Sequence, residues 1–78
     1  PNPFNPTTTV EYGLPTASEV ALTVYNSNGQ AIVTLFNGRQ DAGYHKIAWD
    51  ASQTSAGIYF LEFKAGGFTK MIKMTLLR

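Results

Sequence analysis

The side chains able to perform acid–base or nucleophilic chemistry are few and scattered. His45 is the only histidine, and there is no cysteine. A catalytic histidine needs a nucleophile and an orienting acid beside it, whereas His45 alternates with Ile47 and Trp49. That spacing indicates a histidine packed on a strand or at its rim. The serines, each in a predicted turn, are explained by turn chemistry: Ser18, Ser27, Ser52 and Ser55.

The acidic residues form no recognisable catalytic or metal site. They are Glu11, Glu19, Asp41, Asp50 and Glu62. No two have a spacing that suggests a glycosidase pair. Loop oxygens near Asp41 or Asp50 suit Ca²⁺ chemically, but acids are too sparse there to predict a site. Phosphate-loop, zinc-helix and dinucleotide motifs are missing from the sequence. We therefore expect no enzymatic activity, no metal and no cofactor.

Size and charge limit the remaining classes. The 78 residues carry a net charge of +1, and we expect a single domain over residues 1–78. Nucleic-acid binding calls for a clustered basic face, which this charge does not supply. No apolar run approaches the ~20 residues of a membrane helix, so no direct membrane insertion is expected. Without cysteine, hydrophobic packing must supply nearly all the stability, about 3–5 kcal/mol at this size.

Apolar residues follow a period of two rather than a helical period, which predicts strands. Residues 8–14, 19–25, 31–36, 44–49, 58–63 and 68–77 read as strands. Ile32 and Leu35 do not share one face, which predicts a β-bulge in the third of these. Asn28-Gly29 is a strong hairpin signal because both turn positions tolerate positive φ. We expect a polar loop between Asn37-Gly38 and Ala42-Gly43, and a crossing between sheets over residues 50–57.

Six or seven evenly spaced strands without a helix are typical of an all-β fold. We predict an immunoglobulin-like antiparallel β-sandwich of about seven strands. A five- or six-stranded barrel is the second possibility. The chain closes with a hairpin around Gly66-Gly67, and its last strand is basic, with Lys70, Lys73 and Arg78. A terminal edge strand of this kind can pair with a strand of another protein, and an edge-to-edge dimer is an alternative to the expected monomer.

Over its whole length the sequence resembles the C-terminal sorting domains of type IX secretion system cargo in Bacteroidetes and related bacteria. The match is carried by segments in a fixed order: Pro1-Asn2-Pro3-Phe4-Asn5-Pro6, residues 20–26 with Gly29, Gly43-Tyr44-His45, Trp49-Asp50-Ala51, Ser55-Ala56-Gly57-Ile58-Tyr59-Phe60, and the basic tail ending in Arg78. The family fold is an immunoglobulin-like sandwich, so the resemblance agrees with the fold read from the residues.

The resemblance implies a signal module joined covalently to an upstream cargo domain of a larger secreted protein. It implies translocon recognition by five positions: Gly57, Tyr59, Gly67, Lys73 and Arg78. It also implies passage through the periplasm and across the outer membrane, followed by release or cell-surface attachment. In many members a sortase-like cysteine protease removes the domain, but no clear cleavage site can be read near Pro1.

Each of the five positions also has a plain structural interpretation. The glycines can serve turns, Tyr59 can serve the core, and the lysines can keep an edge strand soluble. Two other functions remain open at this point. An exposed row including Tyr25, Phe36, Tyr44 or Phe60 would indicate a carbohydrate-binding module of a secreted enzyme. A structural spacer in a multidomain surface protein would need no recognition residues.

Overall fold

The computed structural model describes residues 7–77, which form six antiparallel strands. They are β1 (Thr7–Leu14), β2 (Ser18–Asn26), β3 (Ala31–Gln40), β4 (Gly43–Asp50), β5 (Gly57–Ala65) and β6 (Phe68–Leu76). β1 and β4 make a two-stranded sheet, and the other four make a sheet of order β3-β2-β5-β6. The predicted antiparallel sandwich is confirmed, with six strands in the described part where about seven were expected. Two separate sheets rule out the barrel.

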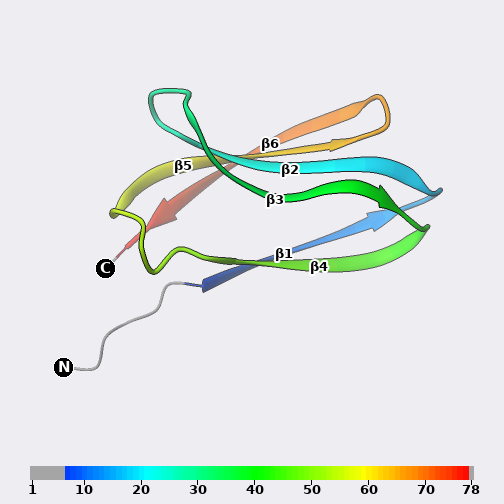
Figure 1. The fold of residues 1–78 in the computed structure, drawn as a ribbon, viewed down its shortest axis with the longest axis horizontal. Helices are drawn as coiled ribbons and strands as arrows, with labels where there is room; N and C mark the ends of the chain where they lie inside the picture. Colours follow the sequence, from blue (N-terminus) through cyan, green and yellow to red (C-terminus); the bar gives the residue numbers. More distant parts are fainter. Residues whose placement is uncertain (1–6, 78) are drawn as a thin grey trace.

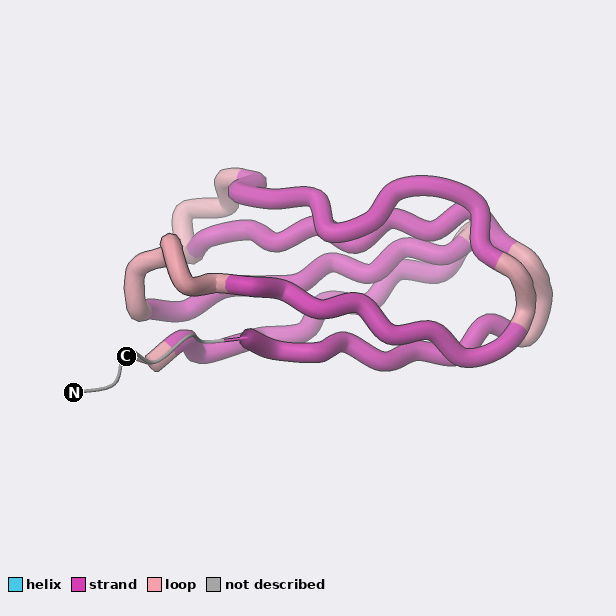
Figure 2. The backbone as a smooth tube through the Cα atoms, turned by 60° about the horizontal axis from the view of Figure 1, so that its bottom comes forward, coloured by secondary structure: helices cyan, strands magenta, loops and turns pink. Residues whose placement is uncertain are grey.

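The strands run lengthwise and turn at the two ends of the domain (Figure 1). Figure 2 shows the strands running lengthwise, with loops gathered at both ends. The two-stranded sheet packs on the larger one through the core. Three connections cross between the sheets, after β1, β3 and β4. The predicted crossing over residues 50–57 is among them. No helix in residues 7–77 is long and apolar enough to cross a membrane.

The core lies between β2 and β5 on one side and the small sheet on the other. Leu22 and Val24 are fully buried, and Leu61 of β5 lies beside them. Because successive side chains of a strand point to opposite faces of the sheet, these residues share one face of the larger sheet. The small sheet contributes alternate residues of β1 and β4, including Trp49. Among residues 7–77, the buried residues are Leu14, Val20, Leu22, Val24, Trp49, Ala51, Tyr59 and Leu61.

β3 contains the irregularity that its sequence predicted. The register of β2 on β3 shifts between Leu22 and Thr23 and again between Val24 and Tyr25. Leu35 and Ile32 are the residues left without a partner at these shifts. Each extra residue reverses the alternation of side chains along the strand. The broken apolar period of β3 is therefore a pair of bulges, and the bulge prediction is confirmed.

Two details of the connections differ from expectation. The loop predicted between residues 37 and 43 is wrong, because β3 continues to Gln40 and pairs with Ser18. Only Asp41 and Ala42 lie outside strands there. The β2–β3 hairpin is confirmed, but its turn is not a two-residue turn at positive φ. Gly29 alone has positive φ in it, and its N–H donates to the Asn26 carbonyl at 3.0 Å.

Candidate recognition surface

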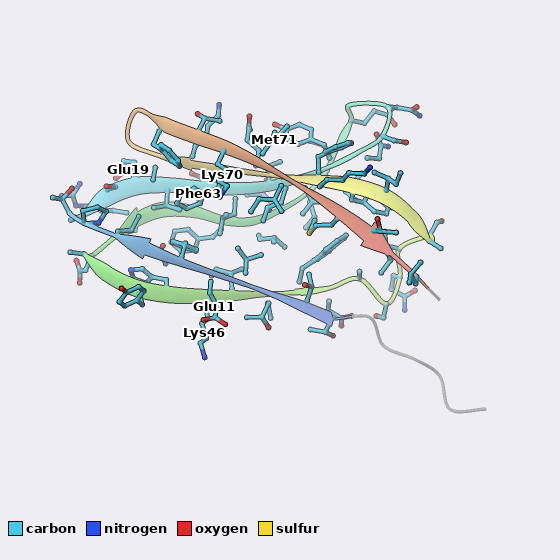
Figure 3. All side chains as sticks on the ribbon, turned by 180° about the vertical axis from the view of Figure 1, so that it is seen from behind. Glu11, Glu19, Lys46, Phe63, Lys70 and Met71 are labelled. Carbon is cyan, nitrogen blue, oxygen red and sulfur yellow. The ribbon has the colours of Figure 1, made fainter. Side chains whose placement is uncertain are left out.

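The two sheets leave one long side of the sandwich open, between β1 and β6. Within residues 7–77, β1 pairs only with β4 and β6 only with β5. On the opposite long side, β3 and β4 approach each other and are joined by Asp41 and Ala42. β6 therefore presents both a free backbone edge and two largely uncovered faces. Seen from behind, β1 and β6 are the strands nearest the viewer (Figure 3).

The outward face of β6 is basic and apolar. Lys73 and Met71 lie on it and are exposed, with 54% of the Met71 surface accessible. Across the ladder, Lys73 is opposite Phe60, and Met71 is opposite Glu62. Lys73 makes no ion pair with any described residue, because the ion pair found in residues 7–77 joins Lys64 to Glu62 at 4.0 Å. Lys73 is thus a free donor for an external anion.

Glu62, the acid of this face, is already engaged. The Tyr25 hydroxyl donates to its Oε1 at 3.1 Å, and Lys64 Nζ lies 4.0 Å from the same oxygen. The hydrogen bond to Glu62, aided by partial burial and by the carboxylate charge, raises the pKa of Tyr25. The outward surface of β5 and β6 carries one carboxylate, that of Glu62, and two lysines, Lys64 and Lys73. This surface therefore has a net positive charge.

Tyr59 lies in the core and not on the surface. It is 7% exposed, and its hydroxyl donates to the Ser55 carbonyl at 2.7 Å. Its ring meets Trp49 edge to face across the two sheets. The hydroxyl fixes the approach to β5, since Ser55 lies two residues before the first residue of that strand, Gly57. Any part that Tyr59 plays in recognition runs through the position of β5.

The two predicted glycines, Gly57 and Gly67, differ in whether their backbone conformation requires glycine. Gly57 opens β5 at φ +152°, in the region that favours glycine, and a Cβ there would come no closer than 4.0 Å to the Tyr59 ring. Gly67 has no positive φ, and a Cβ there would meet nothing within 4 Å. Its neighbour Gly66 carries the left-handed conformation of the β5–β6 turn, at φ +58°. The backbone therefore requires Gly57 and Gly66 but not Gly67.

The five predicted positions are only partly brought together. Gly57 is the first residue of β5, Gly67 lies in the turn beyond its other end, and Lys73 lies on the outward side of β6 opposite Phe60. Arg78 lies outside the described residues. Pro1–Pro6, which carried part of the resemblance, lie outside them as well. Sequence reasoning did not foresee the open side between β1 and β6, because which sheet β1 joins cannot be read from its own alternation.

The aromatic residues do not form a flat row. Tyr25 and Phe60 are register partners on the outward face of the larger sheet and are half-buried. Phe36 packs against the core, while Tyr44 lies on the small sheet with 94% of its surface exposed. His45 is held structurally, since its ring stacks on Tyr12 and its Nε2 lies 2.8 Å from the Asp41 carbonyl. These positions do not favour a carbohydrate-binding platform.

Comparison with known protein families settles the class to which this fold belongs. Residues 1–76 match the family described as the secretion system C-terminal sorting domain. The chain belongs to that family, and it is a C-terminal sorting domain of type IX secretion system cargo, a non-catalytic module. Its role is in secretion across the outer membrane, and a sorting domain of this kind interacts with secretion machinery. Searches of curated proteins and of solved structures gave no match.

Proposed function

We propose that the domain is read by the translocon through β6, its free edge and its uncompensated positive charge. The observation that carries this proposal is the second edge of β6, which pairs with no strand in residues 7–77, together with Lys73, which has no ionic partner among the same residues. Edge pairing supplies affinity through backbone hydrogen bonds, and the flanking side chains supply selectivity. Lys73 and Arg78 are assigned as charge-assisted donors to an acidic receptor surface.

Gly57, Tyr59 and Gly67 take different parts in this proposal. Gly57 and Tyr59 set the start of β5, the only strand to which β6 is hydrogen-bonded in residues 7–77. Their contribution is to position β6 for the receptor. Gly67 lies in the β5–β6 turn without a conformational need for glycine. A requirement for Gly67 in export would therefore point to close approach of the receptor backbone at the turn.

Family membership supports a wider proposal. Residues 1–78 form the single sorting domain of a larger secreted protein, with the cargo joined upstream through the peptide chain. The partners are the translocon and a sortase-like cysteine protease. That protease separates the domain from its cargo, which is then released or attached at the cell surface after passing through the periplasm.

A fusion tests this function. Residues 1–78 are attached to a fluorescent cargo in a host with a type IX system, beside a fusion lacking residues 74–78 and a Lys73→Ala, Arg78→Ala fusion. The intact fusion is expected outside the cell, and both variants in the periplasm. A periplasmic intact fusion, or equal export of all three, contradicts the proposal. The mass of the exported cargo shows whether the domain has been removed.

A further inference from the structure

The inward face of β6 is only partly covered by the small sheet. Phe68, Lys70, Ile72, Met74 and Leu76 share this face, because they alternate with the outward residues. Met74 and Leu76 are half-buried, whereas Phe68 is 56% and Ile72 38% exposed. In a two-sheet sandwich such a row normally faces a strand of the opposite sheet. Here the opposite sheet stops at β1.

Two apolar hollows lie along the gap between β1 and β6. One of about 280 Å³ lies between the start of β1 and the end of β6, where Trp49, Met74 and Leu76 line it. The other, about 510 Å³, lies at the far end against Leu14, Phe63 and Phe68. The two hollows lie at opposite ends of the gap, and Lys70 and Ile72 are exposed between them. We call this side of the sandwich, from one hollow to the other, the groove; β1 and β6 each have a free edge along it. A groove of this form accepts an extended chain and not a compact ligand.

Lys70 gives the groove a charge preference. It is exposed and is the only charged residue on the inward face of β6, between Phe68 and Ile72. It is the register partner of Phe63, and both lie on the side of β6 toward β1, whereas Met71 lies on the other side (Figure 3). No described residue forms an ion pair with Lys70. A carboxylate on an incoming strand would find an unused partner there.

We propose that the groove between β1 and β6 takes an extended strand of a partner protein, with alternating apolar side chains and one acidic residue opposite Lys70. The strand adds to the free edge of β1 and covers the inward face of β6, so that a three-stranded sheet packs on a four-stranded one. Resting on the proposed recognition by secretion machinery, this assigns the strand to that machinery. It also makes the inward face of β6, and not only its outward Lys73, part of what is recognised.

A binding experiment on the 78-residue chain tests the groove directly. The probe is a nine-residue peptide of alternating Val and Thr with Glu at one Val position, and the matched control has Lys there. We expect the Glu probe to bind about threefold to tenfold more tightly than the Lys probe, with amide shifts in β1 and β6. Equal affinity of the two probes, no binding, or shifts confined to β3 or the outward face overturns the proposal.

Variants of the chain distinguish a partner strand from other occupants of the groove. Ile72→Asp, and the milder Ile72→Thr, are expected to lose the probe while Met71→Asp on the opposite face retains it. Circular dichroism confirms that each is folded. An inward charge on an edge strand can also serve only to prevent self-association. If Lys70→Ala dimerises while its affinity for the probe is unchanged, Lys70 has that simpler role and the proposal is overturned. The proposal is also overturned if Phe4 of the same chain contacts Met74 and thereby blocks the probe.

Export of the same variants distinguishes this inference from the proposed function. If the intact fusion is exported while Ile72→Asp stays in the periplasm, and the control Ile32→Asp at a similarly exposed isoleucine on β3 is exported, the groove is part of recognition. If Ile72→Asp is exported as well as the intact fusion, the groove proposal fails and the sorting function stands. If the intact fusion is not exported, the sorting function fails, and the Glu and Lys probes still decide the groove.

Discussion

The rings of Trp49 and Tyr59 meet edge to face, with their centroids 5.7 Å apart and an angle of 72° between their planes. Trp49 belongs to the small sheet and Tyr59 to the larger one, so this contact joins the two layers near the start of β5. Edge-to-face pairs contribute about 0.5–1.5 kcal/mol beyond the area that they bury. Since Trp49 is the only tryptophan, its emission reports on this junction.

The hydroxyl of Tyr59 should contribute to stability separately from its ring. Replacing Tyr59 by Phe keeps the ring and removes only the hydroxyl. Tyr59→Phe removes the hydrogen bond to the Ser55 carbonyl. We expect a loss of about 1 kcal/mol in the free energy of unfolding and a fall of about 5 °C in Tm. Urea unfolding followed by Trp49 emission measures it. Tyr44→Phe is the matched control at an exposed site and should leave stability unchanged, so equal effects of the two variants would contradict the assignment.

Replacing the glycines of β5 and of the β5–β6 turn by alanine should cost different amounts of stability, according to the backbone conformation at each position. Gly57→Ala and Gly66→Ala place a side chain at φ +152° and +58° respectively, and each should cost about 1–2 kcal/mol of stability. Gly67→Ala has ordinary φ and open space and should change stability by less than about 0.5 kcal/mol. Thermal unfolding of the three variants checks this order, and a Gly67→Ala variant as unstable as Gly66→Ala would refute it.

Asp50 should make the stability of the domain sensitive to acid. The backbone N–H of Ser52 donates to its Oδ1 at 3.0 Å. That bond, together with a hydrogen bond from the Ser52 side chain, holds the pKa of Asp50 below its ordinary 3.8. A lowered folded-state pKa adds stability above the unfolded value, and this is lost as pH falls through the folded value. Asp50→Asn should therefore remove part of the stability loss between about pH 5 and pH 2. Parallel acid titrations showing identical slopes would exclude this role.

Leu22 should be among the least replaceable side chains. It is 0% exposed at the centre of the larger sheet, on a strand paired on both sides. Leu→Ala at such a site costs about 2–5 kcal/mol, which is comparable to the whole stability of a domain this small. Leu22→Ala should therefore be largely unfolded at 37 °C by circular dichroism. Its fusion then shows whether export needs the folded sandwich, because Lys73 and Arg78 are unchanged in it.

Much of the fold was accessible from the sequence because period-two alternation is clear in β1, β2, β4 and the second half of β6. Even the failure of that period at Ile32 and Leu35 was informative, since it marked real bulges in β3. The end of β3 was misjudged because Gly38 reads as a turn residue. In the structure Gly38 lies opposite Val20 inside the ladder, where partner pairing outweighs local preference.

The candidate site was less predictable. The outward Lys73 and the edge position of β6 follow from the pattern, because β6 is the return strand of a hairpin. Burial of Tyr59 does not, since the same alternation fits a ring that faces a partner and a ring that faces Trp49. The open groove depends on which strands β1 and β4 choose as neighbours, and pairing between strands far apart in sequence leaves no local signal.

The pairing of β2 with β5 also determines how the domain reaches its folded state. Asn26 and Tyr59 are register partners although β3 and β4 lie between them in the chain. Closing that loop costs entropy before the contacts repay it, and domains dominated by such pairings fold in milliseconds to seconds. The hairpins of β2 with β3 and of β5 with β6 are local and can form first. The joining of these two hairpins should therefore be the slow step of folding, and until it occurs Leu22 and Leu61 remain available to a chaperone.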